Sequence, residues 1–147
     1  MESFVGSLGL VRSSAASPAR WLLMKRAQLE FIHADRLSGD SYRDCIVREI
    51  TWTLNLHRQR DCLVSSYSRL HLSQDIYVPS EAQKVWFDVE FFVAELYTEA
   101  ARRSVADNPH AVWLTGAEVG AGRSNEGLPI CERHSLLMTA ADVISAW

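Results

Sequence analysis

Apolar and polar side chains alternate most clearly in the second half of the chain, over residues 85–97. The apolar members of this alternation are Val85, Phe87, Val89, Phe91 and Val93. Asp88 and Glu90 alternate with them and therefore point to the opposite side. A repeat of two residues is typical of a strand with one buried face, so this segment is predicted to be the strongest strand. Shorter apolar runs predict further strands over residues 4–11, 21–25, 31–32, 62–72 and 111–114.

A central helix is predicted over residues 41–56, because both ends carry capping signals. Ser41 is a suitable N-cap, and Asp44, three residues later, resembles the second member of a capping box. Asn55 tolerates the left-handed backbone conformation with which many helices end. A terminal helix is predicted over residues 132–147, with an apolar stripe made of Leu136, Leu137, Ala140, Val143, Ile144 and Trp147.

The remaining segments are predicted to connect these strands and helices. Residues 13–20, 33–40 and 73–84 are polar or carry glycine or proline, and are expected to be loops. Residues 98–107 fit a short helix or a long loop, and residues 115–119 a helical turn. The glycine-rich stretch 116–127 is expected to be a flexible loop. Strands, a central helix, more strands and a final helix together predict an α/β or α+β sandwich.

Composition narrows the class of protein. A length of 147 residues suits a single domain covering residues 1–147. The formal charge of −3 lacks the positive excess of a nucleic-acid binder, so no nucleic-acid partner is expected. No apolar run approaches the roughly 20 residues that span a bilayer, so no membrane partner is expected either. The chain has three cysteines and no C-x-x-C pair, which favours reduced thiols and a cytoplasmic location.

One segment resembles the signature of a known family. Residues 34–56 read ADRLSGDSYRDCIVREITWTLNL, and this resembles the box of the Nudix (MutT-like) hydrolases, G-x5-E-x7-R-E-U-x-E-E-x-G-U, where U is a bulky aliphatic residue. If Arg48 and Glu49 occupy the R-E pair, Asp40 falls on the first Glu of the pattern. Residues 112–119 (VWLTGAEV) are similar to a W-x-x-x-x-E-L element of many Nudix domains. The resemblance implies a Nudix-like mixed β-sheet sandwiched between helices.

The box is degenerate where the family's chemistry resides. Trp52 and Thr53 replace its E-E pair, Ala34 its opening Gly and Asn55 its closing Gly. In active family members the Glu residues of the box bind a divalent metal at the substrate's diphosphate. At ~100° per residue, positions 52 and 53 lie within about 60° of Glu49 around the helix. One carboxylate therefore remains where the family holds three, and no cofactor is expected unless the protein is an active enzyme that uses Mg²⁺ or Mn²⁺.

Each candidate residue has two interpretations. Glu49 is either a residual catalytic base or a solvated carboxylate held by Arg48. Arg48 either binds a ligand phosphate or pairs structurally with Asp40, and Trp52 either stacks on a nucleobase or packs at the core or its rim. A metal site rebuilt from other carboxylates would draw on Asp40, Glu49, Glu95 and Glu118, with His71, Asp88 and Glu90 as further candidates.

Three functions follow from the degenerate box. The first is a domain that binds a nucleoside-diphosphate derivative, a similar small phosphorylated metabolite or a partner protein, with weak or no hydrolysis. The second is an atypical Mg²⁺-dependent pyrophosphohydrolase with relocated metal ligands and Glu49 as its base. The third is a structural or homodimerisation module, for which the apolar strand at residues 85–96 is the candidate interface.

Overall fold

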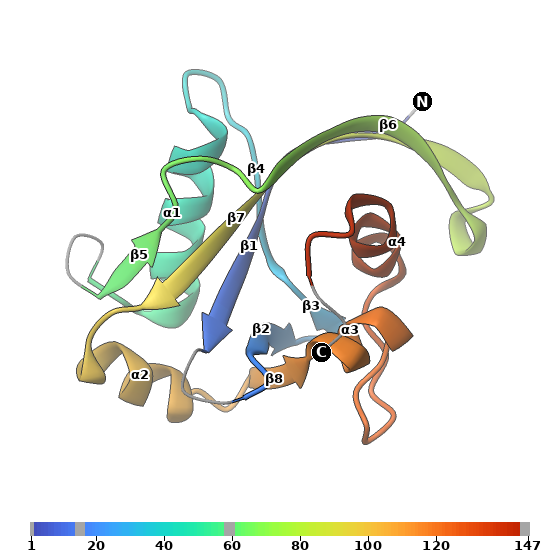
Figure 1. The fold of residues 1–147 in the computed structure, drawn as a ribbon. Coiled ribbons are helices and arrows are strands. Elements are labelled where there is room, and N and C mark those ends of the chain that lie inside the picture. The colour runs from blue at the N-terminus through green and yellow to red at the C-terminus, as the bar shows by residue number, and fades with distance from the viewer. Residues whose placement is uncertain (1, 14–16, 58–60, 145–147) are drawn as a thin grey trace.

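A mixed β-sheet forms the centre of the molecule (Figure 1). The structure is a computed structural model that describes residues 2–13, 17–57 and 61–144. Strands β1 (Glu2–Ser13) and β7 (Gln83–Leu96) run parallel side by side, from the pair Glu2 and Val85 to the pair Arg12 and Glu95. The other strands are β2 (Arg20–Lys25), β3 (Leu29–Glu30), β4 (Ile32–Asp35), β5 (Cys62–Val64), β6 (Leu70–Val78) and β8 (Ala111–Thr115). Strands β2 and β4 pair with β1, β5 and β6 pair with β7, and β3 and β8 pair with β2, all antiparallel.

Helix α1 (Tyr42–Leu54) covers one face of the sheet. Its two ends carry the caps that the sequence predicts. The Ser41 hydroxyl accepts a hydrogen bond from the Asp44 amide at 3.0 Å, and Asn55 ends the helix with φ 53°. Ile46 and Ile50 of α1 are fully buried in the core cluster between helix and sheet. Helix α2 (Glu99–Ala106) adds Val105 to the same cluster, so residues 98–107 form the short helix and not the loop.

The opposite face of the sheet is covered by α4 (Glu132–Ala141), with α3 (Gly116–Ala121) beside it (Figure 1). Leu137 of α4 and Val119 of α3 pack here against Phe87 and Phe91 of β7. The predicted alternation of β7 is therefore confirmed, since its apolar side faces this second core cluster. Helices on both faces of a mixed sheet give the predicted fold class.

The segment between β5 and β7 differs most from the prediction. Residues 62–72 were expected to form one strand and residues 73–84 a loop, but β5 ends at Val64 and β6 runs from Leu70 to Val78. Backbone pairing with β7 causes this, because β6 is in register with it from Leu70 opposite Phe91 to Val78 opposite Gln83. A 3₁₀ turn, η1 (Pro79–Glu81), then reverses the chain. Figure 1 shows β6 and β7 continuing as a curved ribbon past α4.

Several predicted bounds were also wrong. The loop expected over residues 33–40 begins with β4, because residues 32–35 pair with β1. The predicted strand at residues 4–11 is longer at both ends, since its pairing with β7 extends over nearly all of β1. The glycine-rich stretch 116–127 is not wholly a loop, because a Thr115–Glu118 capping box starts α3 within it.

The terminal helix is shorter than the predicted 132–147. It ends at Ala141, where Asp142 takes the left-handed conformation with φ 52°. The end of the predicted stripe, Trp147, lies outside the described residues.

The predicted dimer interface at residues 85–96 is buried inside the molecule. Val85, Phe87, Val89 and Phe91 are at most 1% exposed, and β7 has neighbouring strands on both edges. The apolar side of this strand is core, so it offers no surface to a second copy. The cysteines Cys45, Cys62 and Cys131 are free thiols, as expected. Within the described residues, no helix has the length and apolar character needed to cross a membrane.

Candidate functional site

An open pocket of about 370 Å³ lies between β4 and α1. Strand β4 contributes His33 and Asp35 to its lining, and α1 contributes Cys45, Arg48 and Glu49. Pairing between β4 and β1 places the first two residues, and the packing of Ile46 and Ile50 against the sheet sets the rotation of α1. Residues that carry two carboxylates, an imidazole and a guanidinium therefore line one space of the size typical of small-molecule sites.

Arg48 pairs with Asp40, at 2.5 Å between Nη2 and Oδ2. This contact joins the middle of α1 to the loop that precedes it, and Arg36 also holds this loop through the Asp40 carbonyl. Hydrogen bonding to Asp40 raises the pKa of Arg48, so the guanidinium remains charged. Asp40 is thus the structural partner of Arg48. The Arg48 side chain is also 46% exposed and lines the pocket, so part of it remains accessible to a ligand.

The side chains of Glu49 and Trp52 are more exposed to solvent than those of helix residues that pack in the core. Glu49 is half-buried in the pocket lining and makes no hydrogen bond or ion pair with any described residue. Trp52 is 81% exposed, so it does not pack in the core. It lies one helical turn after Arg48 and Glu49, and side chains at this spacing are neighbours on a helix surface. Trp52 is not part of the pocket lining, but its open indole neighbours two lining residues on the surface of α1.

The thiol of Cys45 at the base of the pocket is not set up as a nucleophile. It is buried and donates a hydrogen bond to the Tyr42 carbonyl at 3.2 Å. Burial raises the pKa of Cys45, which disfavours the reactive thiolate.

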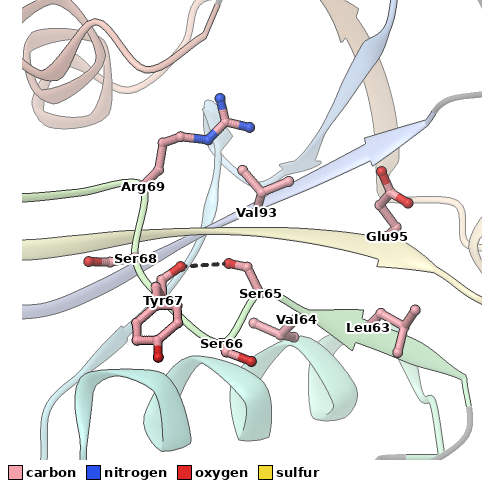
Figure 2. Close-up of a pocket in the computed structure, with 9 residues that line it drawn as sticks. All are labelled: Leu63, Val64, Ser65, Ser66, Tyr67, Ser68, Arg69, Val93 and Glu95. Carbon is pink, nitrogen blue, oxygen red and sulfur yellow. Dashed lines mark hydrogen bonds between the residues drawn. The ribbon is translucent and has the colours of Figure 1, made fainter.

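Glu95 and Glu118 lie away from this pocket. Glu95 pairs with Arg12 of β1, and Figure 2 shows its side chain on the side of β7 that faces away from α1. Glu118 is buried at the start of α3, where it accepts hydrogen bonds from the amides of Thr115 and Asn125 at 3.0 and 2.7 Å. Burial alone would raise the pKa of Glu118, but these hydrogen bonds outweigh it and lower the pKa. The structure therefore brings neither carboxylate together with Glu49.

His71, Asp88 and Glu90 form a network of their own beyond the first turn of α1. The His71 Nε2–H group donates to Asp88, while Nδ1 lies 3.8 Å from Glu90. The Tyr42 ring lies 5.1 Å from the His71 ring, centroid to centroid. Partial burial opposes ionisation of Asp88, but hydrogen bonds from His71, Tyr42 and Ser73 lower its pKa overall. These contacts make the group a link between the sheet and α1.

The donor set does not fit a resident metal ion. Over residues 2–13, 17–57 and 61–144, no three His, Cys, Asp or Glu side chains gather as metal ligands would. At the box positions, Trp52 offers no lone pair and Thr53 only a neutral hydroxyl, whereas Mg²⁺ prefers carboxylate and phosphate oxygens. The described side chains around this pocket therefore do not make a site for a protein-held metal ion.

Another pocket, of about 490 Å³, lies at the turn between β5 and β6 (Figure 2). Ser65, Tyr67 and Arg69 of this turn line it, and Ser65 donates a hydrogen bond to the Tyr67 carbonyl at 2.9 Å. Arg43 of α1 holds the turn by donating to the carbonyls of residues 64 and 65. This pocket contains none of the α1 residues, and its carboxylate Glu95 already has Arg12 as partner, so it is the weaker candidate.

Sequence reasoning missed three residues near the candidate site: His33, Asp35 and His134. The first two fell in a predicted loop, although polar side chains at every second position are a weak sign of a strand. His134 lies on α4, some 100 residues further along the chain, and lines a smaller pocket together with His33 and Asp35. Only the folded chain brings these residues together.

Comparison with known proteins shows the fold. No protein-family model matches the sequence, and no curated protein matches it. Among solved structures, Shewanella oneidensis NrtR complexed with a 27mer DNA matches with a TM-score of 0.63 and 11% identity. That match covers 93% of this chain and 59% of the NrtR chain, so this chain spans less than two thirds of that protein.

Two further structures cover most of both chains. A mutT/nudix family protein from Listeria innocua matches with a TM-score of 0.60 and 14% identity, over 96% of this chain and 90% of that one. The Nudix hydrolase RenU from M. smegmatis matches with a TM-score of 0.53 and 15% identity, over 95% and 85%. The fold is therefore Nudix-like, and identities this low show the fold alone.

Proposed function

We propose that this Nudix-fold protein binds a nucleoside-diphosphate derivative, or a similar small phosphorylated metabolite, with weak or no hydrolysis. The observation that carries the proposal is the pocket between β4 and α1, where α1 presents one carboxylate, Glu49, beside an exposed Trp52. A diphosphate would lie along Arg48, and the indole would stack on a ring of the ligand. We expect no nucleic-acid partner, although NrtR, which spans more chain than this protein, was crystallised with DNA.

The charge of the pocket predicts the form of the ligand. Asp35 and Glu49 repel a bare diphosphate, and one guanidinium, already paired with Asp40, compensates only in part. A diphosphate that carries its own Mg²⁺ meets less repulsion, because Mg²⁺ bridges phosphate oxygens and one or two carboxylates. Binding is therefore expected to tighten when millimolar Mg²⁺ accompanies the ligand.

A binding and turnover assay tests the proposal. ADP-ribose, nucleoside diphosphates, dinucleotides and nucleotide sugars are titrated into the protein by calorimetry with and without Mg²⁺, and product release is followed. Saturable binding without turnover supports the proposal. Product release that Glu49→Gln abolishes would instead establish the atypical hydrolase, which the joint presence of Asp35 and Glu49 in one pocket favours as the second candidate. Absence of binding by the whole panel would contradict both.

Trp52→Ala is expected to weaken the tightest of these ligands at least about fivefold, because aromatic stacking on a base contributes roughly 1–3 kcal/mol. The indole is 81% exposed, so its removal leaves the core intact. Tyr97→Ala is the matched control, since Tyr97 is 64% exposed and follows the end of β7, on a different element from Arg48 and Glu49. Equal affinities for wild type and Trp52→Ala would remove Trp52 from the site.

The double substitution Trp52→Glu with Thr53→Glu is expected to tighten Mn²⁺ binding by about tenfold or more. It places two carboxylates next to Glu49 on one face of α1, and grouped oxygen donors are what hard divalent cations require. The neutral pair Trp52→Gln with Thr53→Gln is the control for the loss of the native side chains. If the two double variants bind Mn²⁺ equally in calorimetry, the replacement of the Glu pair by Trp52 and Thr53 is not what prevents metal binding at this site.

A further inference from the structure

Strand β6 lies at an edge of the central sheet. It pairs with β7 along its whole length, and no other described strand pairs with it. Within the described part of the chain, the backbone of residues 71–78 makes no hydrogen bond to any segment other than β7. An edge strand of nine residues with free N–H and C=O groups is a ready template for pairing with another chain.

The bonds between β6 and β7 show which backbone groups of β6 point outward. The Phe91 carbonyl accepts a hydrogen bond from the Arg69 amide at 2.6 Å, so Phe91 and alternate residues along β7 direct their peptide groups toward β6. The residues opposite them, such as Gln74 opposite Phe87, point their own peptide groups inward to β7. The residues of β6 between these point theirs outward. The outward residues are His71, Ser73, Asp75 and Tyr77.

The sequence of β6 is complementary to itself about Gln74. If two copies lie antiparallel with Gln74 opposite Gln74, then His71 lies opposite Tyr77 of the second copy. In the same register, Ser73 lies opposite Asp75. Every outward residue then has an outward partner with which to exchange hydrogen bonds, and no like charges face each other. A shift by two residues places Asp75 opposite Asp75 or leaves Tyr77 without an outward partner.

The apolar side chains of β6 obey the same symmetry. Leu72 and Val78 belong to the core cluster on the α4 face of the sheet, and Ile76 packs against it. In the register about Gln74, Leu72 lies opposite Ile76 of the second copy, on this same face. Leu70, which is 36% exposed in the single chain, lies opposite Val78. Apolar residues therefore meet apolar residues across the two strands.

The pocket of about 490 Å³ at the turn between β5 and β6 adjoins this edge. Because Leu70 faces Val78 of the second copy, residues 65–69 of this turn lie beside the turn η1 that follows β6 in that copy. Tyr67 of the pocket lining is 87% exposed. The Arg69 guanidinium has no partner among the described residues, and Figure 2 shows it on the side of β7 that faces away from α1.

The tip of the β6–β7 ribbon is acidic on the α4 side. Glu81 lies in η1, and Glu132 of α4 accepts a hydrogen bond from the backbone of η1 at 3.1 Å. Glu2 binds Arg133 at 2.8 Å, and Arg133 also binds Glu81. Three carboxylates thus surround one guanidinium, which leaves a net negative charge. The free guanidinium of Arg69 is complementary to such a tip in a second copy.

We propose that two copies of this chain pair through the outer edges of β6, antiparallel about Gln74. The η1 turn of each copy occupies the pocket beside Arg69 of the other, so that one continuous sheet crosses the dimer. The sequence suggested a dimer through residues 85–96, but that strand is buried, and β6 is the strand that covers its edge. The pairing uses no residue that lines the pocket between β4 and α1, so it is independent of the proposed function.

Sedimentation equilibrium from micromolar to submillimolar concentration tests the pairing. The wild type is expected to reach twice the 16.6 kDa mass of one chain as its concentration rises. Asp75→Pro removes an outward N–H from each copy at an edge position where proline is tolerated, so it is expected to weaken the dimer at least about tenfold. Asp75→Ala keeps that N–H and is the matched control, expected to retain the dimer.

Arg69→Glu tests the contact with the acidic tip. It is expected to weaken the dimer at least about fivefold, because both copies then present a carboxylate to the partner's carboxylates. The same change at Arg26, in the turn between β2 and β3, is the matched control for charge reversal away from β6. Added salt is expected to weaken the wild-type dimer and to have less effect on Arg69→Glu.

Amide hydrogen exchange identifies the paired edge directly. The amides of Ser73 and Asp75 are expected to exchange more slowly as the protein concentration rises, whereas those of Leu72 and Gln74, already bound to β7, stay protected at every concentration. This measurement and Arg69→Glu still decide the matter if Asp75→Pro fails to fold. A wild type that stays a monomer overturns the proposal, and so does a dimer that a folded Asp75→Pro protein retains. Neither result bears on ligand binding between β4 and α1.

Discussion

Replacing Gly6 with alanine is expected to destabilise the protein by more than about 3 kcal/mol. A Cβ on Gly6 would lie 2.0 Å from the carbonyl oxygen of Ala34 and 3.0 Å from its carbonyl carbon. These are backbone atoms of β4, paired with β1 through Gly6 and Asp35, so no side-chain rotation can relieve the contact. Overpacking normally costs roughly 1–3 kcal/mol, and separating two paired strands of the central sheet should exceed that range.

Gly9→Ala is the matched control on the same strand. A Cβ there would lie 2.9 Å from Cδ1 and 3.1 Å from Cγ1 of Ile50, and 3.2 Å from Cγ1 of Ile46. These are side-chain atoms, which can shift by a few tenths of an ångström where the backbone beside Gly6 cannot. Urea unfolding should show a moderately lowered midpoint for Gly9→Ala, in the usual range of overpacking, and a much lower one, or no folded state, for Gly6→Ala. A Gly6→Ala protein as stable as the control would mean that β4 does not approach β1 as the structure shows. It would also question the positions of His33 and Asp35.

The parts of the fold that were predicted correctly are those encoded by neighbouring residues. Ser41 and Asn55 mark the ends of α1 by capping, which depends on a few adjacent backbone groups. The apolar alternation of β7 is strong because one side faces a core cluster. Local sequence therefore specified the central helix and the central strand.

The parts that were missed depend on partners elsewhere in the chain. Strand β6 contains Ser73, Gln74 and Asp75, residues with little preference for strands, and it forms because β7 lies beside it. Strand β4 forms in the same way beside β1. Such strands are mostly exposed on one face or at one edge, so their sequences carry a weak hydrophobic pattern.

In the candidate site, too, the features set by neighbouring residues were predictable and those set by distant parts of the chain were not. The pairing of Arg48 with Asp40 follows from the spacing within one box, and the structure contains it. The exposure of Trp52 could not be read from its aromatic character, since aromatic residues are more often buried. His134 joins His33 and Asp35 in the smaller pocket only because the start of α4 lies against Phe31, and no local pattern indicates this contact.

Acidification from pH 7 to pH 5 is expected to cost wild type ~2 kcal/mol of folding free energy through His134 alone. In the folded protein, burial lowers the pKa of this histidine from the ordinary 6.5 to about 3. Below pH 6.5 the unfolded chain therefore binds a proton at this position that the folded chain does not. Stability falls with pH across the window from 6.5 to 3, because the unfolded state is the one favoured by protonation.

The variant His134→Asn separates the contribution of His134 to the pH dependence of stability from the contributions of the other titrating groups. His134→Asn should be less stable than wild type at pH 7, since a buried ring is lost, but its urea midpoint should change much less between pH 7 and pH 5. His110→Asn removes an exposed imidazole and should keep the wild-type dependence on pH. The carboxylates whose pKa values are lowered, Asp88, Glu81 and Glu118, lose their contribution only at lower pH, so they do not mask the comparison. A wild-type midpoint that does not change between pH 7 and pH 5 would show that His134 takes up a proton in the folded state. The hydrogen bond from Phe31 to Nδ1 could not then persist, because a protonated imidazole has no acceptor.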